Sequence, residues 1–391
     1  MSTLRSSFFL ASLALVSFAH TQACQEAKTT EEVETDKVES VLRQVVSGVL
    51  IPHLQVFQED LALLETELTS LQNDPSPEQL STTQNQWMTV MKSWQKLEMM
   101  QFGPAGNSLK VTAGEDIRDE IYSWPSINRC RVDQKTASQE YSNENFFAEN
   151  LVHAYGLDAL EHLLFSGNDP ACPSQVSPVS DGLWQDLGEE TIASHRTEYA
   201  LVTIKDIQNR NQELISNWSE EGDNFSATFI SGDTPYPSAT ESLNDVFRAL
   251  FYLETHTKDK KLAHPLGLKD CQEDTCIDDL EGVLSLSSLD SIIGNLEGFA
   301  VLFTGADGYG FDDYLIDLGH ADLSQQVIQN LEEAIDYGYS LQVPLKDGII
   351  EDIDSVMELH TRIAKITTQL KNELPIVLTL EVPVETLGDN D

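Results

Sequence analysis

Two carboxylates and an imidazole lie close together in residues 155–167, the segment of this chain with the most chemical information. Asp158, Glu161 and His162 occupy positions i, i+3 and i+4, and in an α-helix this spacing places them on one face. Three leucines recur at helical spacing and predict such a helix: Leu157, Leu160 and Leu164. Oxygen and nitrogen donors gathered in this way suit a metal site or a proton-transfer site.

The structural alternative for this segment is a solvated helix face with an Asp158–His162 pair, because short motifs often arise by chance. Other catalytic patterns find little support in the sequence. It has no Gly-x-Ser-x-Gly and no His-Glu-x-x-His, and most of its nine histidines are scattered singly. The cluster at residues 158–162 is therefore the strongest candidate for chemistry.

The charge balance restricts the partners. The chain of 391 residues has 65 acidic and 23 basic residues, which give a net charge of -42. A charge of this size repels phosphate backbones and anionic lipid, so nucleic acid is excluded as a partner and electrostatic adsorption to a membrane is disfavoured. With 40% apolar residues, the chain can still bury a substantial core, and its length corresponds to two or three domains.

The first 23 residues are typical of an export signal. Arg5 supplies a positive charge, and the apolar residues 8–19 form a stretch too short to span a bilayer comfortably. Residues 21–24, Thr-Gln-Ala-Cys, are similar to a bacterial lipobox. We expect Cys24 to become a lipid-anchored N-terminus, with ordinary cleavage after Ala23 as the alternative. The predicted location is the bacterial periplasm, outer membrane or cell surface, with membrane contact only through the lipid.

Four further cysteines remain if Cys24 carries lipid. Export places them in oxidising surroundings, where an even number of cysteines favours disulfides. Cys271 and Cys276 enclose a short acidic loop and are expected to pair, which leaves Cys130 to pair with Cys172. A zinc cluster is the rival interpretation, but no Cys-x-x-Cys spacing supports it.

Helical periodicity dominates the chain and strand patterns are sparse, so we predict an all-α fold. A kink or break is expected at Pro52, inside the first helix. The tail at residues 376–382 is expected to be strand-like or extended. The expected helices cover residues 36–71, 78–101, 145–165, 188–218, 240–258, 284–303, 312–337 (broken near Gly319) and 351–374.

Composition shifts divide the chain into two domains. Residues 24–36 are polar and acidic and are interpreted as a tether, residues 222–239 as a linker, and residues 385–391 as a tail. The domains would then cover residues 37–221 and 240–384. About four helices lie on each side of the linker, and residues 163–167 are similar to residues 301–305. Both observations favour two related four-helix bundles.

Several landmarks, in this order and spacing, resemble the imelysin family, which is called after an insulin-cleaving membrane protease. The resemblance covers about residues 37 to 380. The landmarks are Phe102-Gly103-Pro104, Tyr122-Ser123-Trp124-Pro125, Cys130-Arg131-Val132-Asp133, the segment from Gly156 to Gly167, Lys261-Leu262, Pro265-Leu266-Gly267, Asn295-Leu296-Glu297-Gly298-Phe299 and Leu302-Phe303-Thr304-Gly305.

The resemblance implies two helical bundles packed side by side with a shared cleft. It also implies a bacterial envelope protein, often a lipoprotein and often linked to iron acquisition. The family motif Gly-x-His-x-x-Glu falls on residues 156–161, where Gly156 and Glu161 match and Asp158 replaces the histidine. A carboxylate in place of an imidazole favours hard ions such as calcium, magnesium or ferric iron. It also argues against the peptidase activity that the family resemblance implies.

A metal site is therefore expected around Asp158 and Glu161, with Glu98 and Asp133 as additional oxygen ligands. Gly156, Trp124 and Arg131 are expected beside it in the cleft. Structural alternatives are open for three of these residues. Asp133 would cap a helix, Arg131 would neutralise Glu161, and Trp124 would belong to the core.

The leading hypothesis is a non-enzymatic envelope lipoprotein that binds a divalent or ferric ion, a metal complex or an iron-uptake protein of the envelope. The first alternative is an imelysin-type metallopeptidase, in which Glu161 holds the metal or acts as the base and His162 assists. The second alternative is a surface interaction module without catalysis.

Overall fold

The computed structural model describes residues 30–386, and every regular element in that range is helical, with no β-strand. The prediction of an all-α fold is confirmed. The expected export signal, Cys24 and residues 387–391 lie outside the described residues. Within the described range, no helix combines the length and the apolar run that crossing a membrane requires.

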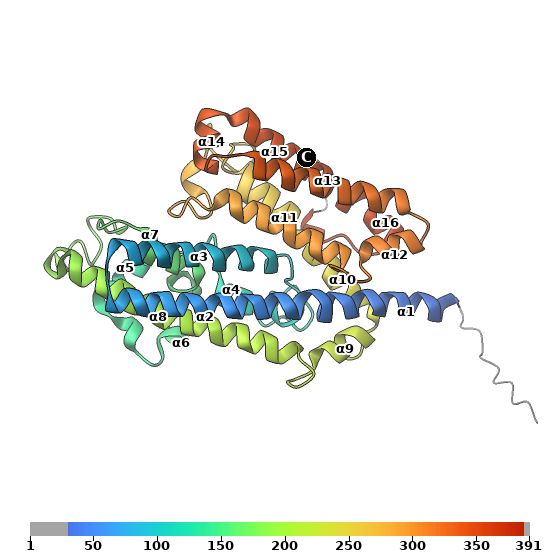
Figure 1. The fold of residues 1–391 in the computed structure, drawn as a ribbon, viewed down its shortest axis with the longest axis horizontal. Helices are drawn as coiled ribbons and strands as arrows, with labels where there is room; N and C mark the ends of the chain where they lie inside the picture. The colour runs from blue at the N-terminus through green and yellow to red at the C-terminus, as the bar shows by residue number, and fades with distance from the viewer. Residues whose placement is uncertain (1–29, 387–391) are drawn as a thin grey trace, which may run out of the picture.

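One long helical rod opens the fold. It consists of α1 (Thr30–Arg43), the π-helical turns η1 (Gln44–Leu50) and α2 (Ile51–Asn73), and it is the long blue helix of Figure 1. The break expected at Pro52 does not occur. The ring of a proline clashes with a carbonyl of the preceding α-helical turn, and here the wider π-helical turns directly precede it. Part of the expected tether is also helical, since its glutamates suit the first turns of a helix.

The first group of helices packs around α2. Its long members are α3 (Pro77–Leu97) and α8 (Leu183–Trp218), which both lie along α2, and the short α7 (Leu157–Phe165) packs on α3 and α8. The apolar positions of α3 recur at helical spacing and are buried, including Trp87, Met91 and Trp94. Shorter elements of this half of the chain are η2 (Gly103–Ala105), α4 (Ile117–Ile121), α5 (Arg129–Ser138), η3 (Glu140–Ser142), α6 (Phe146–Glu149) and η4 (Val152–Ala154).

The second group packs around α11 (Ser288–Thr304), with α13 (Ala321–Ser340), α15 (Ile353–Asn372) and the π-helical η5 (Leu253–Ala263). These are the yellow, orange and red helices of Figure 1. The remaining elements are α9 (Phe225–Ser231), α10 (Ala239–Leu250), η6 (Ile277–Asp279), α12 (Phe311–Asp317), α14 (Leu345–Glu351), α16 (Leu374–Leu378) and η7 (Val384–Thr386).

The structure differs from the expected secondary structure at three places. The helix expected at residues 145–165 is divided into α6, η4 and α7, because Gly156 has φ +98° and begins a new helix. The linker at residues 222–239 contains α9, and the tail at residues 376–382 begins in α16 rather than in a strand. Local polarity and β-branched residues suggested loop and strand, but packing against neighbouring helices decides the outcome.

The two groups meet where α3 and α11 pack together. Gly294 and Gly298 of α11 allow this close approach, since a Cβ at Gly298 would lie 2.5 Å from the carbonyl oxygen of Lys96. The rod also joins the groups, because α1 packs on α10 and α12 while α2 packs on α3 and α8. Buried apolar residues of both groups form one continuous core. The division into two bundle domains stays a prediction.

Replacing Gly298 with alanine tests this close packing. Alanine stabilises a helix by about 1 kcal/mol relative to glycine, but overpacking against rigid backbone costs about 2–3 kcal/mol, the upper part of the usual range. We therefore expect Gly298→Ala to lower the free energy of unfolding by about 1–2 kcal/mol in urea denaturation. Gly167→Ala is the control, since nothing lies within 4 Å of a Cβ at Gly167. An unchanged urea midpoint for Gly298→Ala would contradict the close packing.

Candidate functional site

A sharp turn at Gly156 places the motif at the start of a buried helix. A side chain at Gly156 would need the unfavourable φ of +98° and would bring its Cβ 2.9 Å from the carbonyl oxygen of Ile121. Directly after it, residues 157–164 of α7 are all buried. Trp87 of α3 donates a hydrogen bond from Nε1 to the carbonyl oxygen of Leu157 (3.1 Å). The motif carboxylates therefore sit on a fixed scaffold and not on a solvated helix face.

Asp158 and Glu161 both line a cleft of about 1050 Å³. One side of the cleft comes from residues 122–130 and α7, and the other comes from η5 and residues 264–282. Trp124 also lines it, although only 8% of its surface is exposed. Six carboxylates line the cleft: Asp158, Glu161, Asp259, Asp270, Asp278 and Asp279. Three basic residues line it: Arg129, Lys260 and Lys269. The expectation of a cleft between the two halves of the chain therefore fits the structure.

Asp158 is a buried carboxyl group without an ion-pair partner among the described residues. Only 5% of its surface is exposed. Its Oδ2 accepts a hydrogen bond from Ser123 Oγ (2.9 Å), and its Oδ1 accepts one from the backbone N–H of Ala159 (2.9 Å). Burial raises the pKa of Asp158 to about 7, against these two hydrogen bonds, which favour the ionised form. A cation in the cleft would stabilise the carboxylate that burial disfavours.

Glu161 connects the two halves of the chain. Its Oε1 accepts hydrogen bonds from the backbone N–H groups of Leu284 (3.1 Å) and Ser285 (2.9 Å) and from Ser285 Oγ (2.8 Å). Residues 284 and 285 precede α11, so one oxygen of this carboxylate holds a loop of the second group against α7. The same side chain also lines the cleft. Glu161 is therefore both an anchor and an oxygen donor at the cleft.

Glu98 lies outside the cleft, in contrast to the sequence-based expectation. Arg118 donates two hydrogen bonds to its carboxylate, from Nε (3.1 Å) and from Nη2 (2.8 Å), and Tyr252 donates a third. The carboxylate is completely buried. A bidentate arginine pair neutralises this charge and occupies both oxygens. Glu98 is therefore not available as a ligand beside Asp158 and Glu161.

Asp133 and His162 form a second buried pair outside the cleft. His162 Nε2 lies 2.8 Å from Asp133 Oδ1, and Asp133 Oδ2 accepts from the backbone N–H of Ala171 (2.6 Å). Asp133 does not cap a helix, since it lies inside α5 and its Oδ2 binds the backbone of Ala171, which is not helical. The predicted pair of His162 with Asp158 is also absent. Because His162 faces Asp133, the structure does not bring its imidazole to Glu161 as the peptidase hypothesis requires.

Arg131 is exposed and donates a hydrogen bond to Gln134 of its own helix (3.1 Å), so it neither lines the cleft nor neutralises Glu161. Arg129, two residues earlier, lines the cleft in its place. Side chains two positions apart on a helix point in nearly opposite directions. Sequence analysis identified the correct segment but missed the residue, because the start of α5 was not predicted.

Both expected disulfides are present. Cys130 pairs with Cys172, and Cys271 pairs with Cys276. The first ties the start of α5, which lines the cleft, to the segment after α7. The second closes the loop that leads into η6. Both bonds therefore stabilise walls of the cleft.

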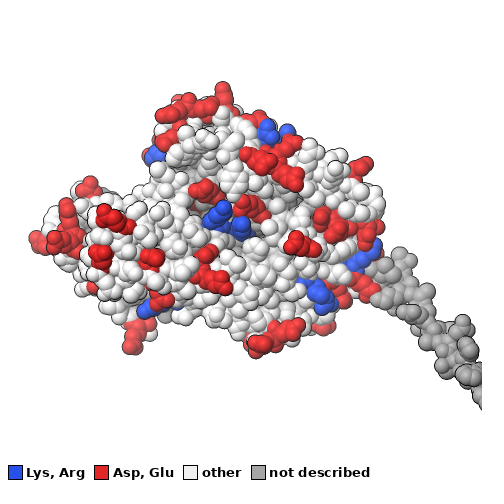
Figure 2. Space-filling view, viewed as in Figure 1, with Lys and Arg blue, Asp and Glu red and all other residues white. Residues whose placement is uncertain are grey.

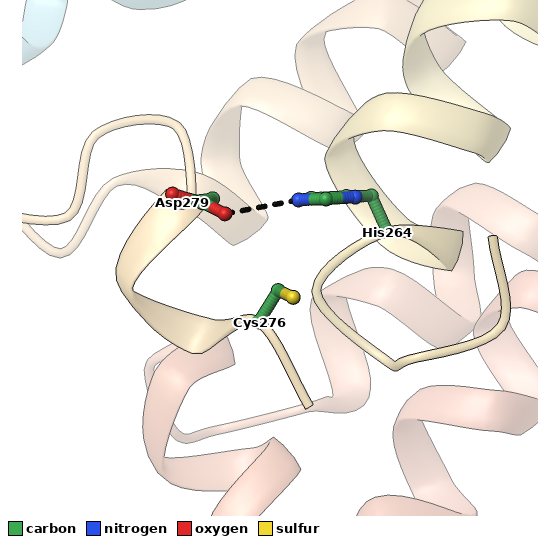
Figure 3. Close-up of side chains that lie close together, drawn as sticks. All are labelled: His264, Cys276 and Asp279. Atoms are coloured by element: carbon green, nitrogen blue, oxygen red, sulfur yellow. Dashed lines mark hydrogen bonds and ion pairs between the residues drawn. The ribbon is translucent and has the colours of Figure 1, made fainter. Parts of the chain in front are cut away.

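A separate group of potential metal ligands lies on the rim of the cleft. Figure 3 shows His264 and Asp279 facing each other, with Cys276 nearby. His264 Nε2 and Asp279 Oδ2 are 3.0 Å apart. Cys276 is oxidised in a disulfide, and metal ligation requires a thiolate. We therefore interpret His264 and Asp279 as a hydrogen-bonded pair and not as a metal site.

A polar network lies behind the cleft. Lys261 Nζ contacts Glu281 Oε2 (2.9 Å) and donates to Gln95 Oε1 (2.7 Å). Tyr122 donates to Glu281 Oε1 (2.7 Å), and Asn295 Nδ2 donates to Gln95 Oε1 (2.9 Å). Each of these residues is almost completely buried. The network joins α3, η5, α11 and both walls of the cleft.

The surface agrees with the acidic composition. Figure 2 shows acidic side chains scattered over one face of the molecule and a small basic group near its middle, where α3 and α11 lie side by side in Figure 1. At this junction Lys96 of α3 forms an ion pair with Glu297 of α11 (3.0 Å). This face gives no extended basic surface for a polyanion.

The helical fold and the cleft at the motif define an imelysin-type protein. The family model of imelysin matches residues 50–372, and the chain belongs to this family. It is 21% identical over 344 residues to iron-regulated protein A of Synechococcus elongatus, with 85% of each chain covered.

Two crystal structures have the same fold. An imelysin-like protein from Psychrobacter arcticum matches with a TM-score of 0.67 and 17% identity, over 89% of this chain and 98% of the other. A putative iron-regulated protein A precursor from Parabacteroides distasonis matches with a TM-score of 0.66 and 14% identity, over 91% and 96% of the two chains. At these identities the likeness concerns the fold.

The raised pKa of Asp158 predicts a pH-dependent stability. Its pKa is about 7 in the folded protein against an ordinary value of 3.8, so between these pH values the folded state binds more protons than the unfolded state. The free energy of unfolding therefore receives a contribution from Asp158 that falls as pH rises from about 4 to about 7. Its size is on the order of a few kcal/mol. Asp158→Asn removes this contribution.

We expect the difference in unfolding free energy, Asp158→Asn minus wild type, to grow across this pH range in urea denaturation. Asp186→Asn is the control, since Asp186 is exposed on α8. Parallel pH profiles for wild type and Asp158→Asn would contradict the buried, unpaired state of the carboxyl group.

Proposed function

We propose that this protein binds a metal ion in the cleft and works in the bacterial envelope in the handling of iron. The observation that carries the proposal is that Asp158 and Glu161, one helical turn apart, both line the same cleft. Asp158 has no cationic partner among the described residues, and Glu161 directs only one oxygen to the neighbouring loop. The pair can therefore supply oxygen ligands to a cation.

The donor set favours a hard ion. Carboxylate oxygens bind calcium, magnesium, manganese and ferric iron in preference to soft metals. The imidazole of His162 faces Asp133, and all four described cysteines are in disulfides. Ligands that favour zinc are therefore not presented beside the motif, and we place a non-catalytic binding role above peptidase activity.

The names of two relatives support a link to iron. Both the Synechococcus elongatus protein and the Parabacteroides distasonis protein are called iron-regulated protein A. Such a name describes regulation by iron and specifies no ligand. Together with oxygen donors suited to ferric iron, it favours iron or an iron complex as the physiological ligand. Proteins of envelope iron uptake are the corresponding class of partners.

A lipid on Cys24 is proposed to attach the protein to a membrane of the envelope. The disulfides support an exported protein, since they persist in oxidising compartments. We expect the protein expressed in a bacterial host to incorporate radiolabelled palmitate and to lose the label in Cys24→Ser. Cys24→Ser should still be exported and form both disulfides. Labelling that persists in Cys24→Ser, or its absence in wild type, would contradict the lipid anchor.

Cation titration tests the site itself. We expect isothermal titration with Mn²⁺ or Ca²⁺ to show binding that Asp158→Asn and Glu161→Gln each weaken by about tenfold or more, since each removes a charged ligand. Both substitutions keep the shape of the side chain, and the amide introduced by Glu161→Gln would keep an oxygen for the loop. Because protons compete for Asp158, affinity should fall by up to about tenfold per pH unit below its pKa of about 7.

Asp186→Asn and Glu190→Gln are the matched controls, since both residues are exposed on α8 and away from the cleft. Each removes one negative charge from the whole protein without touching the motif. Equal binding by the controls and by the motif variants would show that the titration measures only the general acidity of the surface. That outcome, or no heat with wild type, would contradict the proposed function.

A further inference from the structure

Two basic residues of the cleft make no ion pair within residues 30–386. The chain has only 23 basic residues against 65 acidic ones, so a free cationic side chain has many possible partners. Among the described residues, most lysines and arginines do contact a carboxylate, as Lys269 does with Asp259 (2.8 Å). Arg129 and Lys260 line the same cleft without such a contact. Their charges are therefore not neutralised by the described part of the protein.

Lys260 is positioned by a neutral partner. Its Nζ lies 3.2 Å from Nε2 of His256, whose Nδ1 lies 2.9 Å from Thr255 Oγ1. The imidazole also stacks on Tyr252, with ring centroids 4.4 Å apart. Burial, and then Lys260 and Arg118, hold the pKa of His256 well below its usual value, so the ring accepts a hydrogen bond from the ammonium group. This contact orients Lys260 and leaves its charge intact.

Arg129 stands on the opposite wall. It is the first residue of α5, next to the N-cap Asn128, and it is half-buried. Its neighbours Asn128 and Cys130 line the cleft with it, and Cys130 is fixed by its disulfide. The start of α5 thus places Arg129 at the cleft.

The acidic residues of the cleft also divide into those with an ion-pair partner and those without one. Asp259 contacts Lys258 and Lys269, Asp279 contacts His264, and Asp278 contacts Lys346. Asp158 and Glu161 have hydrogen-bond donors but no ion-pair partner among the described residues. The unneutralised groups are therefore the two motif carboxylates and the two basic side chains, with the exposed Asp270 in addition.

The cleft is much larger than a bare metal ion. The volume is about 1050 Å³, whereas one water molecule occupies about 30 Å³ in the liquid. Clefts of several hundred Å³ or more are typical of small-molecule sites. A ligand that fills this cleft needs a cationic centre for the carboxylates and anionic groups for the basic side chains.

We infer that the cleft receives its metal as a chelate with a small polycarboxylate, whose free carboxylates bind Arg129 and Lys260 while the metal faces Asp158 and Glu161. This inference rests on the proposed function and specifies its ligand class. Arginine and lysine both form charge-assisted hydrogen bonds with carboxylates. No bond of the chelator needs to break for binding, since the motif carboxylates complete or replace solvent ligands of the metal.

Gallium(III) citrate is a suitable probe, because gallium(III) is a redox-inert trivalent ion of hard character. We propose calorimetric titration of the full-length mature protein with gallium citrate, with citrate alone and with Mn²⁺ alone. Wild type should bind gallium citrate at least about tenfold more tightly than citrate. Arg129→Gln and Lys260→Gln should each weaken binding of gallium citrate by about tenfold. Both variants should bind Mn²⁺ at least as well as wild type, because a positive charge is removed.

Arg131→Gln and Lys365→Gln are matched controls. Arg131 lies on the same helix as Arg129, Lys365 lies on α15, and both are exposed outside the cleft. They should bind gallium citrate as wild type does. Thermal melting curves should coincide for all four variants, since none of the four side chains is completely buried.

The outcomes separate the two proposals. If Arg129→Gln and Lys260→Gln bind gallium citrate as tightly as wild type, or if citrate alone binds as tightly as gallium citrate, the inference of a chelate is overturned. The proposed function then stands as long as Mn²⁺ binds and Asp158→Asn weakens it. If neither Mn²⁺ nor gallium citrate binds wild type, the proposed function fails and the inference fails with it.

Discussion

The ion pair between Lys261 and Glu281 is the interaction on which the cleft depends. Both side chains are about 1% exposed, so each charge would be costly to bury without the other. Gln95 of α3 and Tyr122 complete their hydrogen bonds. These residues belong to different walls of the cleft and to the helix behind it. Removing one partner would leave an uncompensated charge where the two helix groups meet.

Glu161 extends the same principle to the front of the cleft. A carboxylate from α7 satisfies backbone N–H groups of a loop that belongs to the second group. The position of the loop therefore depends on the position of α7. The motif residues are thus part of the junction between the groups, and a ligand bound to them contacts the junction directly.

Sequence periodicity predicted the long helices well, since α3, α8, α13 and α15 have regular apolar stripes and clear stops. It failed where a feature of the backbone determines where a helix begins or how it continues. Gly156 begins a new helix inside a continuous apolar pattern, and the π-helical turns before Pro52 leave no signature in hydrophobic spacing. The predicted disulfides followed from counting cysteines, which requires no geometry.

The candidate site shows the same division between local and long-range information. The spacing of Asp158 and Glu161 is local, and the structure places both at the cleft. Glu98 and Asp133 were selected by their position near family landmarks. In the structure, Glu98 accepts hydrogen bonds from Arg118, and Asp133 is paired with His162. Arg129 and Lys260 are distinguished only by the absence of a carboxylate partner among the described residues, which no sequence pattern reveals.

The rod of α1, η1 and α2 has a consequence for how the chain can be divided. The apolar face of α1, with Val38, Val41 and Leu42, is buried where α1 packs on α10 and α12. The first helix of the described residues thus completes the core of the half that is synthesised last. A fragment starting at residue 240 would expose the surface of α10 and α12 that α1 covers, and a fragment ending at residue 221 would expose the apolar face of α1. The packing of α1 therefore links the two ends of the described chain.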